Sequence, residues 1–408
     1  MQLNYSVIII GAGPGGASVA ARLEQHGHAG RVLVLERYGF PRPKPCGGGL
    51  TGHVNEAMAE LDLTLSVPHW PADLARVRFG SFVRTVRMAR PVNIVRREEF
   101  DHSLVEQVRA KGIEVAEGEG VKAIEVTGDA VTVTTSLGRT LRCSVLVGAD
   151  GAASVTRKYI LANARTLPHR LFKMEMALPQ SRSIDPAMLY DFTPMVHGIR
   201  GYLWVFPLPG RRVNVGVMHY PTYRKSGIEL VERLRSGLAE LGLSLPARGA
   251  RGWPAWGYHP RAPISRPRVL TVGDAAGIDG LTGEGISVAM EHAVVAGDAV
   301  DQALRTGDMS FSGYRQAIRR AVVGRELALD RWLARLLYEK RGQGWRKWLS
   351  LVLYDPDVLD MYAARVSGSE ILADQKLRLY RALLRHICSL PGRNRSLRQA
   401  MTEMYSLT

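Results

Sequence analysis

The chain has few cysteines, no long apolar run, no internal repeat and no low-complexity tract. Its three cysteines, Cys46, Cys143 and Cys388, are too few and too scattered for a disulfide framework or a metal site. Apolar runs stay shorter than about 18 residues, so a membrane-spanning helix is not expected. No signal-peptide pattern precedes the first predicted strand, because Gly11 to Gly16 interrupts the N-terminal apolar run. These absences predict a protein of the reducing cytoplasm.

Acidic residues are scarce relative to basic ones. The 408 residues carry a formal net charge of +16, with 54 Lys or Arg against 38 Asp or Glu. No zinc-finger spacing or basic heptad accompanies this charge, so nucleic acid is not expected as a partner. An anionic membrane surface or a diphosphate-bearing substrate fits the charge better. The length allows two or three subdomains, and a monomer agrees with the sequence although nothing in it defines the oligomeric state.

The first stretch with a clear pattern is residues 6–37. The β-branched run 7–10 predicts a buried parallel strand, residues 17–26 a helix, and residues 31–35 a second strand. A glycine-rich turn joins the first strand to the helix. This strand–turn–helix–strand order is the context that a dinucleotide-binding motif requires.

The glycines of this turn fit the pattern G-x-G-x-x-G. Gly11 would permit the tight turn, Gly13 would let the backbone approach a pyrophosphate, and Gly16 would let helix and strand pack closely. The phosphates would lie on the helix N-terminus. Glu36 ends the second strand, 20 residues beyond Gly16. Its carboxylate could accept hydrogen bonds from a ribose and would repel the 2′-phosphate of NADP, and the N-terminal position of the unit favours FAD over NAD.

A proline- and glycine-rich stretch, residues 37–51, follows the dinucleotide unit directly. Its three prolines forbid a helix, and Gly47, Gly48 and Gly49 would let other atoms approach the backbone. Cys46 stands among these glycines. The stretch is either a functional loop beside the dinucleotide or an ordinary surface loop.

Strands and one helix are predicted next. Residues 75–95 alternate as strands, a helix should run from 96 to about 111, and 121–135 form a hairpin. The strand at 145–147 ends in Gly148-Ala149-Asp150-Gly151. Residues 161–256 have the character of strands with few helical periods.

Aromatic residues gather in one strand of this region. Tyr202, Trp204 and Phe206 alternate with period two and therefore share one face. A matching strand at 213–217 follows across a Pro-Gly turn. The aromatic strip either lines a binding site or belongs to an ordinary sheet core.

A second candidate cofactor contact lies late in the chain. Residues 269–274 predict a strand that ends in the carboxylate of Asp274. A glycine turn, residues 281–286, then opens a helix predicted over 287–304. Beyond Met309 the chain is expected to be helical and basic.

Together these motifs carry a family resemblance. Gly11–Gly16, Gly148-Ala149-Asp150-Gly151 and Gly273-Asp274-Ala275-Ala276 resemble the three fingerprints of single-FAD oxidoreductases of the aromatic hydroxylase type. Lys44-Pro45-Cys46-Gly47-Gly48-Gly49-Leu50 and Tyr202-x-Trp204-x-Phe206-Pro207 resemble the geranylgeranyl reductase family. One departure from that family's strand is Ile199, where the family usually has a proline.

The resemblance implies an α/β fold: a Rossmann-like FAD-binding domain with an inserted antiparallel β-sheet substrate domain and a helical C-terminal region. The FAD-binding part would comprise residues 1–74, 96–160 and 259–308. The substrate sheet would comprise 75–95 and 161–258, and the helical region 309–408.

The resemblance also implies contact residues. FAD would be held by Gly11, Ala12, Gly13, Gly15, Gly16, Glu36, Arg37, Cys46, Gly47, Arg97, Val121, Asp274, Gly283, Gly285 and Ile286. Tyr202, Trp204 and Phe206 would contact an isoprenoid. No metal is expected.

The function that the resemblance implies is reduction of isoprenoid C=C bonds, with hydride from reduced FAD. Isolated alkenes are poor hydride acceptors, so an acid must assist, and the thiol of Cys46 is the candidate. Cys46 could instead be a small packing residue. The alternative enzyme is a flavin-dependent monooxygenase or halogenase, and a non-enzymatic reading is a redox-sensing flavoprotein. The electron donor, NAD(P)H or another reductant, is undefined.

The last fifth of the chain, residues 331–408, has 14 Lys or Arg against 7 Asp or Glu. It mixes cations with aliphatic residues and with the indoles of Trp345 and Trp348. Such a helix could lie in the headgroup layer of a membrane. It could equally cap the FAD domain with its apolar face. The expected location is therefore the cytoplasm, with a peripheral position on the inner face of the membrane if the helix docks there.

Overall fold

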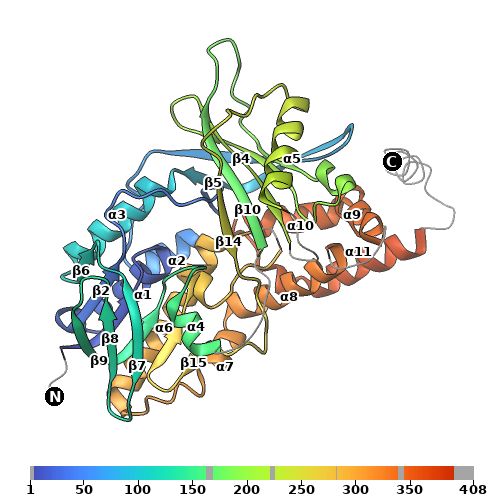
Figure 1. Cartoon of the computed structure of the whole chain (residues 1–408). Coiled ribbons are helices and arrows are strands. Elements are labelled where there is room, and N and C mark those ends of the chain that lie inside the picture. Colours follow the sequence, from blue (N-terminus) through green and yellow to red (C-terminus); the bar gives the residue numbers. More distant parts are fainter. Residues whose placement is uncertain (1–3, 162–168, 221–225, 282, 339–343, 390–408) are drawn as a thin grey trace.

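The computed structural model describes residues 4–161, 169–220, 226–281, 283–338 and 344–389 (Figure 1). Its first sheet, with the core order β15-β16-β9-β1-β2-β6, is parallel from β16 to β6. A β7–β8 hairpin joins this sheet through β9. The strands are β1 (Tyr5–Ile10), β2 (Val32–Glu36), β6 (Glu114–Glu117), β7 (Val121–Val126), β8 (Val131–Thr135), β9 (Thr140–Gly148), β15 (Ser265–Arg266) and β16 (Val269–Thr271).

The central strands of this sheet are covered on both faces, which explains their unbroken apolar runs. Val7 and Ile9 of β1 pack toward the helices, whereas Ile8 and Ile10 pack toward the β7–β8 hairpin. The helices of this part are α1 (Pro14–Gln25), α2 (Val54–Glu60), α3 (Arg97–Ala110), α4 (Val155–Leu161), α6 (Gly285–Thr306) and α7 (Tyr314–Arg320), with short 3-10 turns at η1 (Ala29–Arg31) and η3 (Gly273–Ala275).

The second sheet has the order β14-β10-β13-β12-β11-β4-β5-β3. Its pairs are antiparallel except that β11 runs parallel to β4. The strands are β3 (Gly49–Leu50), β4 (His69–Phe79), β5 (Phe82–Val95), β10 (His169–Ala177), β11 (Met188–Asp191), β12 (Leu203–Leu208), β13 (Arg212–His219) and β14 (Arg251–Ala255). A 3-10 turn, η2 (Thr193–His197), follows β11.

One helix of this second part was not predicted. α5 (Gly227–Glu240) packs Leu230, Leu234 and Leu238 against one face of the sheet. The expectation that residues 161–256 have the character of strands with few helical periods is wrong for this segment. The missed signal is a capping box, in which Ser226 and Glu229 each accept a hydrogen bond from the other's backbone N–H.

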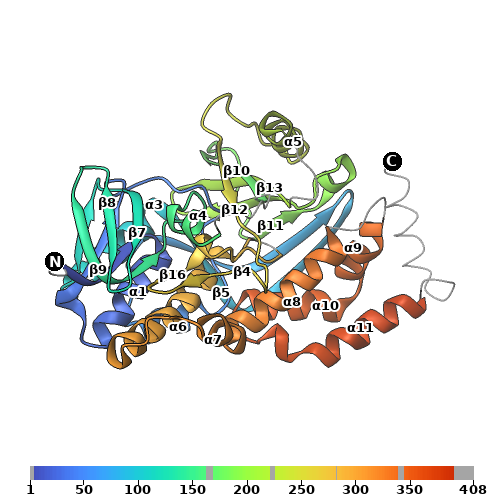
Figure 2. The same cartoon turned by 60° about the horizontal axis from the view of Figure 1, so that its bottom comes forward.

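The C-terminal region is helical, as predicted. It packs on the part of this sheet that β4 and β5 form (Figure 2). It comprises α8 (Val322–Leu337), α9 (Gly344–Tyr354), α10 (Pro356–Val366), η4 (Leu372–Asp374) and α11 (Lys376–Ser389). Residues 390–408 of the predicted membrane-docking tail lie outside the described residues.

Trp345 does not have the position that membrane docking requires. Its side chain is 3% exposed and packs edge-on against Phe79 of β4, with ring centroids 6.1 Å apart. Trp348 is half-buried in the same cluster. The expected placement of the Trp345 indole at a membrane surface is therefore wrong, and α9 turns this residue toward the sheet. Among the described helices, none is both long and apolar enough to cross a bilayer.

Candidate functional site

A cavity of about 880 Å³ lies between the two sheets. Its walls come from the turn after β1, the loop between β2 and β3, the aromatic strand β12 and the loop before α6. Most of the predicted site residues line it: Gly11, Gly13, Gly15, Glu36, Arg37, Cys46, Gly47, Arg97, Val121, Tyr202, Trp204, Phe206, Asp274, Gly283, Gly285 and Ile286. Ala12 and Gly16 do not line it. The fold thus brings together segments that are far apart in the sequence.

The glycine turn is shaped by close backbone contacts at two positions. Gly11 has φ +97°, and a Cβ there would lie 2.4 Å from the carbonyl oxygen of Ala149. A Cβ at Gly16 would lie 1.9 Å from the carbonyl oxygen of Gly11. At Gly13 the nearest atom to a Cβ would be a guanidinium nitrogen of Arg42, 3.6 Å away. Gly13 is therefore open on its cavity side, as the approach of a phosphate requires.

Glu36 is held rigidly at the end of β2. Its carboxylate is 4% exposed and accepts hydrogen bonds from the backbone N–H groups of Ala12 (3.0 Å) and Tyr38 (3.2 Å). Arg42 adds an ion pair at 3.3 Å. These partners keep a carboxylate at the cavity wall beside the glycine turn.

A buried ion pair fixes Arg97 at the start of α3. Asp101 accepts two hydrogen bonds from its guanidinium, at 2.8 and 2.9 Å. Burial by itself lowers the pKa of Arg97, but Asp101 and the neighbouring Cys46 more than offset this and raise it above its usual value. A permanent positive charge therefore stands next to the loop that carries Cys46.

The aromatic strand is tied to the Cys46 loop through an asparagine. Trp204 Nε1 donates to Asn214 Oδ1 at 3.0 Å, and Asn214 Nδ2 donates to the carbonyl oxygen of Cys46 at 2.8 Å. A Cβ at Gly47 would lie 3.0 Å from the ring of Phe206. Sequence reasoning missed Asn214, whose signal is a polar residue inside the apolar run Val213–Val217.

Lys44 is a second missed residue of the same loop. Its ammonium lies 3.3 Å from Asp274 and 4.2 Å from the centroid of the Trp253 ring. Burial lowers the pKa of Lys44, and Asp274 opposes that shift. The pair connects the loop to the end of β16.

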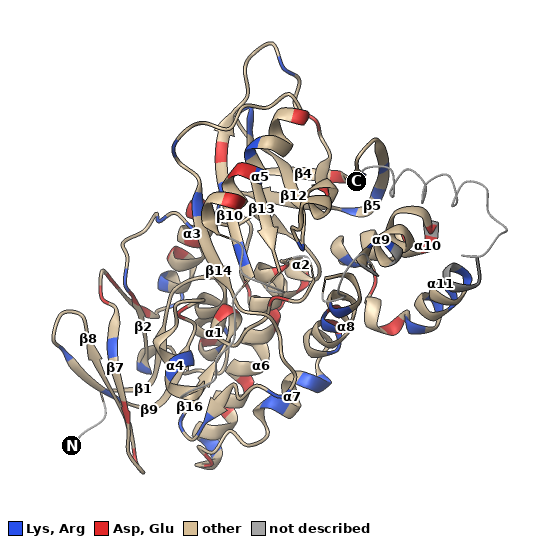
Figure 3. Cartoon of the chain, turned by 45° about the vertical axis from the view of Figure 1, so that its right-hand side comes forward, with Lys and Arg blue, Asp and Glu red and all other residues tan. Residues whose placement is uncertain are grey.

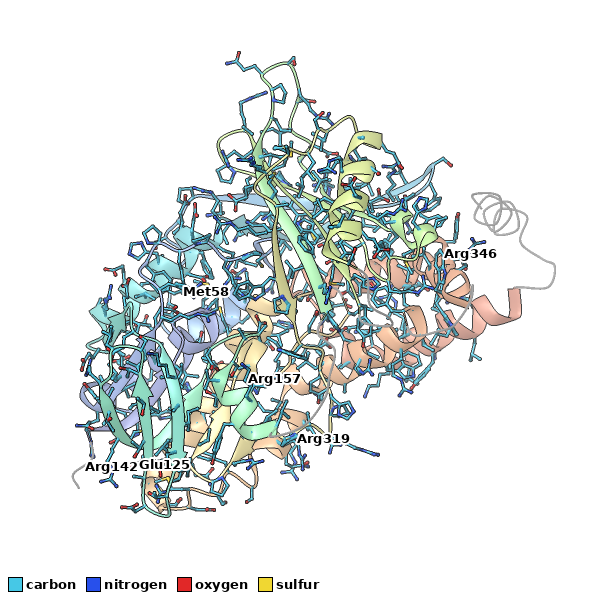
Figure 4. All side chains as sticks on the ribbon, in the orientation of Figure 1. Met58, Glu125, Arg142, Arg157, Arg319 and Arg346 are labelled. Carbon is cyan, nitrogen blue, oxygen red and sulfur yellow. The ribbon has the colours of Figure 1, made fainter. Side chains whose placement is uncertain are left out.

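Arg157 of α4, labelled in Figure 4, supports the loop that follows β16. It donates to the carbonyl oxygen of Ala275 at 3.1 Å and lies 4.7 Å from the centroid of the Trp256 ring. Burial lowers its pKa to about 10. The contact is structural and holds the Asp274 loop against the first sheet.

A buried histidine–aspartate pair also lines the cavity and was not predicted. His169 Nδ1 and Asp279 Oδ2 form a short hydrogen bond, and both side chains are almost wholly buried. Within the described structure, Asp279 Oδ1 has no hydrogen-bond partner. The ring of Tyr220 packs on His169 at 4.2 Å. Single histidine and aspartate residues 110 positions apart give no sequence signal of this pairing.

A second, apolar cavity of about 110 Å³ shares the lining residue Tyr190 with the first. It lies between β4–β5 and helices α8–α11. Tyr190 lines both cavities, and its ring centroid is 5.4 Å from that of Tyr202 and 5.1 Å from that of Phe206. The aromatic strip therefore contacts, through Tyr190, the wall of this apolar space.

A buried charge cluster ties the loop before α6 to the C-terminal helices. Arg365 of α10 lies 2.9 Å from Glu284 and 2.7 Å from Asp330, and it also pairs with Glu326. Tyr362 donates a hydrogen bond to Glu284 at 3.1 Å. Because burial outweighs the attraction of Arg365, the pKa of Asp330 rises to about 7. Arg365 thus faces three carboxyl groups, those of Glu284, Glu326 and Asp330.

Glu291 of α6 should make stability depend on pH. Burial, reinforced by Glu326 and Glu284 but opposed by Arg365, raises its pKa to about 7. A carboxyl whose folded-state pKa is raised stabilises the fold below its unfolded pKa, and this contribution is lost as pH rises through 7. Glu291→Gln should therefore be more stable than the natural protein by roughly 1–2 kcal/mol at pH 8, with little difference at pH 5. Urea unfolding at both pH values measures this.

The exposed Glu125 on β7, labelled in Figure 4, provides the control for this measurement. Glu125→Gln should leave the pH dependence of unfolding unchanged. An equal gain for both variants, or none for Glu291→Gln at pH 8, would contradict the assignment.

The chain is similar in sequence to one known protein family and to several proteins that are named as reductases. The family described as FAD binding domain matches residues 4–325. A menaquinone reductase of Mycolicibacterium smegmatis is 28% identical over 327 residues, covering 73% of this chain and 76% of the relative. A digeranylgeranylglycerophospholipid reductase 2 of Methanococcoides burtonii is 26% identical over 348 residues, with coverages of 80% and 82%.

Solved structures share the fold. A geranylgeranyl bacteriochlorophyll reductase-like protein from Thermoplasma acidophilum superposes with a TM-score of 0.68 at 20% identity, covering 94% of this chain and 96% of that one. The flavin-dependent halogenase CmlS superposes with a TM-score of 0.64 at 22% identity, with coverages of 95% and 78%. A reductase-like protein and a halogenase share this architecture. The fold therefore does not define the reaction, which must be inferred from the residues of the site.

Proposed function

Because this chain belongs to the FAD-binding domain family, with FAD as its cofactor, we propose that it is a reductase that saturates C=C bonds of a polyprenyl lipid. The observation that carries the proposal is the apolar cavity beside the cofactor cavity. A long hydrocarbon chain could extend past Tyr190 into it while one of its double bonds stays near Cys46. A small aromatic substrate has no use for this second space.

The residues of the main cavity fit FAD. Gly13 offers an open backbone for the pyrophosphate, and Glu36 presents a carboxylate for a ribose. Arg97 and Lys44 supply positive charge at the cavity wall. Ile286, at the first turn of α6, would present its backbone N–H at the positive end of that helix, and Gly285 would line the cavity while its own N–H donates to the carbonyl oxygen of Gly283 at 2.9 Å. Arg37, Val121, Asp274 and Gly283 complete the proposed contacts.

Bound and reduced, FAD would supply a hydride equivalent to one carbon of the alkene. The chain must then supply the proton for the other carbon and keep water away. Cys46 is half-buried in the cavity wall, and its Sγ would hold that proton. The His169–Asp279 pair is a second group that could hold a proton at the cavity wall. Tyr202, Trp204 and Phe206 would exclude water and orient the apolar chain.

The names of the relatives agree with this substrate class. Two of them are called menaquinone reductase and digeranylgeranylglycerophospholipid reductase. For this chain we therefore propose a substrate with a polyprenyl portion. We also propose that this protein associates peripherally with the membrane and takes its substrate from the lipid there. NAD(P)H or another reductant would supply the electrons.

An anaerobic single-turnover experiment tests the reaction. Protein reduced by dithionite should reoxidise when a polyprenyl substrate is added, and the product should gain two hydrogens for each bond reduced. Flavin absorbance and mass spectrometry of the lipid measure both changes. A strict requirement for oxygen would contradict the proposal and favour a monooxygenase or halogenase. Failure with every polyprenyl acceptor would favour a redox-sensing flavoprotein.

Cys46→Ala should slow this reduction by about 100-fold while FAD stays bound, because the variant removes a proton donor and leaves the loop backbone intact. Asn214 holds the loop through the carbonyl oxygen of Cys46, and this anchor remains in Cys46→Ala, although the variant loses the contact of the Gly48 N–H with Sγ at 3.5 Å. The buried Cys143 of β9, which lies outside the cavity, provides the control as Cys143→Ala. Equal rates for Cys46→Ala and the natural protein would make Cys46 a packing residue.

A further inference from the structure

The outer face of α11 exposes three large apolar side chains. Leu377, Tyr380 and Leu384 are 74%, 53% and 61% exposed. Their spacing of three and four residues places them on a single stripe of the helix. Trp332 of α8 lies beside this stripe, with its ring 6.5 Å from that of Tyr380. We call these four residues the α11 stripe.

Positive charge borders the α11 stripe. At 3.6 residues per turn, Lys376 falls on one side of it, and Arg381 and Arg385 fall on the other. Figure 3 shows basic residues along α11. Arg385 pairs with Asp355 and Asp357, whereas in the described structure Lys376 and Arg381 form no ion pair. Exposed apolar residues between cations are the composition that an interfacial helix needs.

The inner face of the same helix borders the apolar cavity. Leu379 and Leu383 line it, and Tyr190 lines it at the side of the aromatic strip. α11 therefore forms one wall of that cavity, between it and the outer surface of the protein. Figure 2 shows α11 at the outer edge of the C-terminal helices, below α8 and α10.

We propose that α11 lies on an anionic lipid membrane, with the α11 stripe among the lipid chains and Lys376 and Arg381 on the phosphates. The inner face of α11 then brings the apolar cavity next to the bilayer, so that an isoprenoid tail passes from lipid to protein without crossing water. The second part of this proposal rests on the proposed function, whereas the docking itself does not.

Charge argues against the other occupants of this face. If a second copy of the chain bound this face through its own α11, its basic residues would repel Lys376 and Arg381. The net charge of +16 on each chain adds to this repulsion. Residues 390–408 contain three arginines and one glutamate, so they are also of like charge. Nucleic acid would satisfy the cations but not the exposed leucines. An anionic membrane satisfies both.

Flotation of the full-length, FAD-loaded protein with vesicles tests the docking. Vesicles of phosphatidylcholine with about one-third phosphatidylglycerol should bind the protein, and pure phosphatidylcholine should bind it weakly. The triple variant Leu377→Ser, Tyr380→Ser, Leu384→Ser should lose affinity on the order of 100-fold. Arg381→Glu should weaken binding to the anionic vesicles alone.

A matched control has three exposed apolar residues changed elsewhere. Val83, Leu137 and Ile228 are 50%, 68% and 77% exposed, on β5, after β8 and on α5. Their triple change to serine should leave flotation unchanged. Flavin content and the melting temperature show whether each variant is folded. No flotation of the natural protein, or equal flotation of the two triple variants, would overturn the proposal, and so would a change from dimer to monomer in the α11 variant.

Activity separates this proposal from the proposed function. The α11 variant should reduce a detergent-dissolved polyprenyl substrate at the natural rate, but a vesicle-embedded one at least about 10-fold more slowly. An equal rate on embedded substrate would overturn the delivery role of α11. Absence of reduction by the natural protein in detergent would refute the proposed function and leave the flotation result intact.

Discussion

Gly13→Asp should leave the protein folded but nearly free of FAD. The structure has room for this side chain, because the nearest atom to a Cβ at Gly13 is a guanidinium nitrogen of Arg42 at 3.6 Å. The backbone there is extended, with φ −73° and ψ −177°, which any residue adopts. A carboxylate at this position would occupy the space proposed for the pyrophosphate. Two like charges about 4 Å apart cost on the order of 4 kcal/mol, which corresponds to roughly a 1000-fold loss of affinity.

The ratio of flavin to protein absorbance and an equilibrium titration with FAD measure this effect. Gly30→Asp is the matched control, because a Cβ at Gly30 meets no atom within 4 Å and Gly30 does not line the cavity. Gly30→Asp should be as yellow as the natural protein. If Gly13→Asp folds and retains its flavin, the proposed pyrophosphate position is wrong.

Arg365→Met should be the most destabilising change in the C-terminal region. The guanidinium is 5% exposed and faces the carboxylates of Glu284, Glu326 and Asp330. Removal of one partner leaves buried negative charge without compensation, and breaking a buried pair typically costs about 3–5 kcal/mol. Burial already raises the pKa of Asp330 to about 7, so part of this charge can be neutralised by protons. The loss should therefore be larger at pH 8 than at pH 5.

Thermal and urea unfolding at the two pH values measure this loss. Arg235→Met removes an exposed arginine that pairs with Glu232, and it should change stability by less than about 1 kcal/mol. Since Glu284 directly precedes α6, Arg365→Met should also weaken FAD binding. Equal stability of the two variants would contradict the structural role of the cluster.

The cofactor part of the fold could be predicted from local sequence. The strand–turn–helix unit at residues 6–37 was predicted close to its observed bounds, because buried parallel strands have continuous apolar runs and the tight turn needs glycine. The FAD-binding family and the cofactor are confirmed by the match over residues 4–325, and the resemblance to geranylgeranyl-type reductases by the relatives and the structural neighbour of that name. The contacts proposed for individual residues stay predictions.

Other features were missed because their signals were weak or nonlocal. α5 was read as part of a strand region, although its capping box is local and could have been found. The His169–Asp279 pair depends on two residues 110 positions apart, and the Arg365 cluster joins α10 to residues of α8 and the loop before α6. Such contacts leave no periodicity along the chain.

The sequence by itself determined the dinucleotide unit, the period-two aromatic strand and the basic, helical C-terminal region, since each depends on spacing within one short segment. Only the tertiary structure decided which amphipathic helix faces outward. Trp345 is buried against Phe79, whereas Leu377, Tyr380 and Leu384 stay exposed. α9 and α11 both mix apolar residues with cations, so hydrophobic periodicity could not tell which of the two helices is buried against the sheet and which is exposed. The physical difference is that the sheet formed by β4 and β5 offers one apolar surface, which α8, α9 and α10 cover. α11 packs outside these helices, and among the described residues its outer face stays exposed at Leu377, Tyr380 and Leu384.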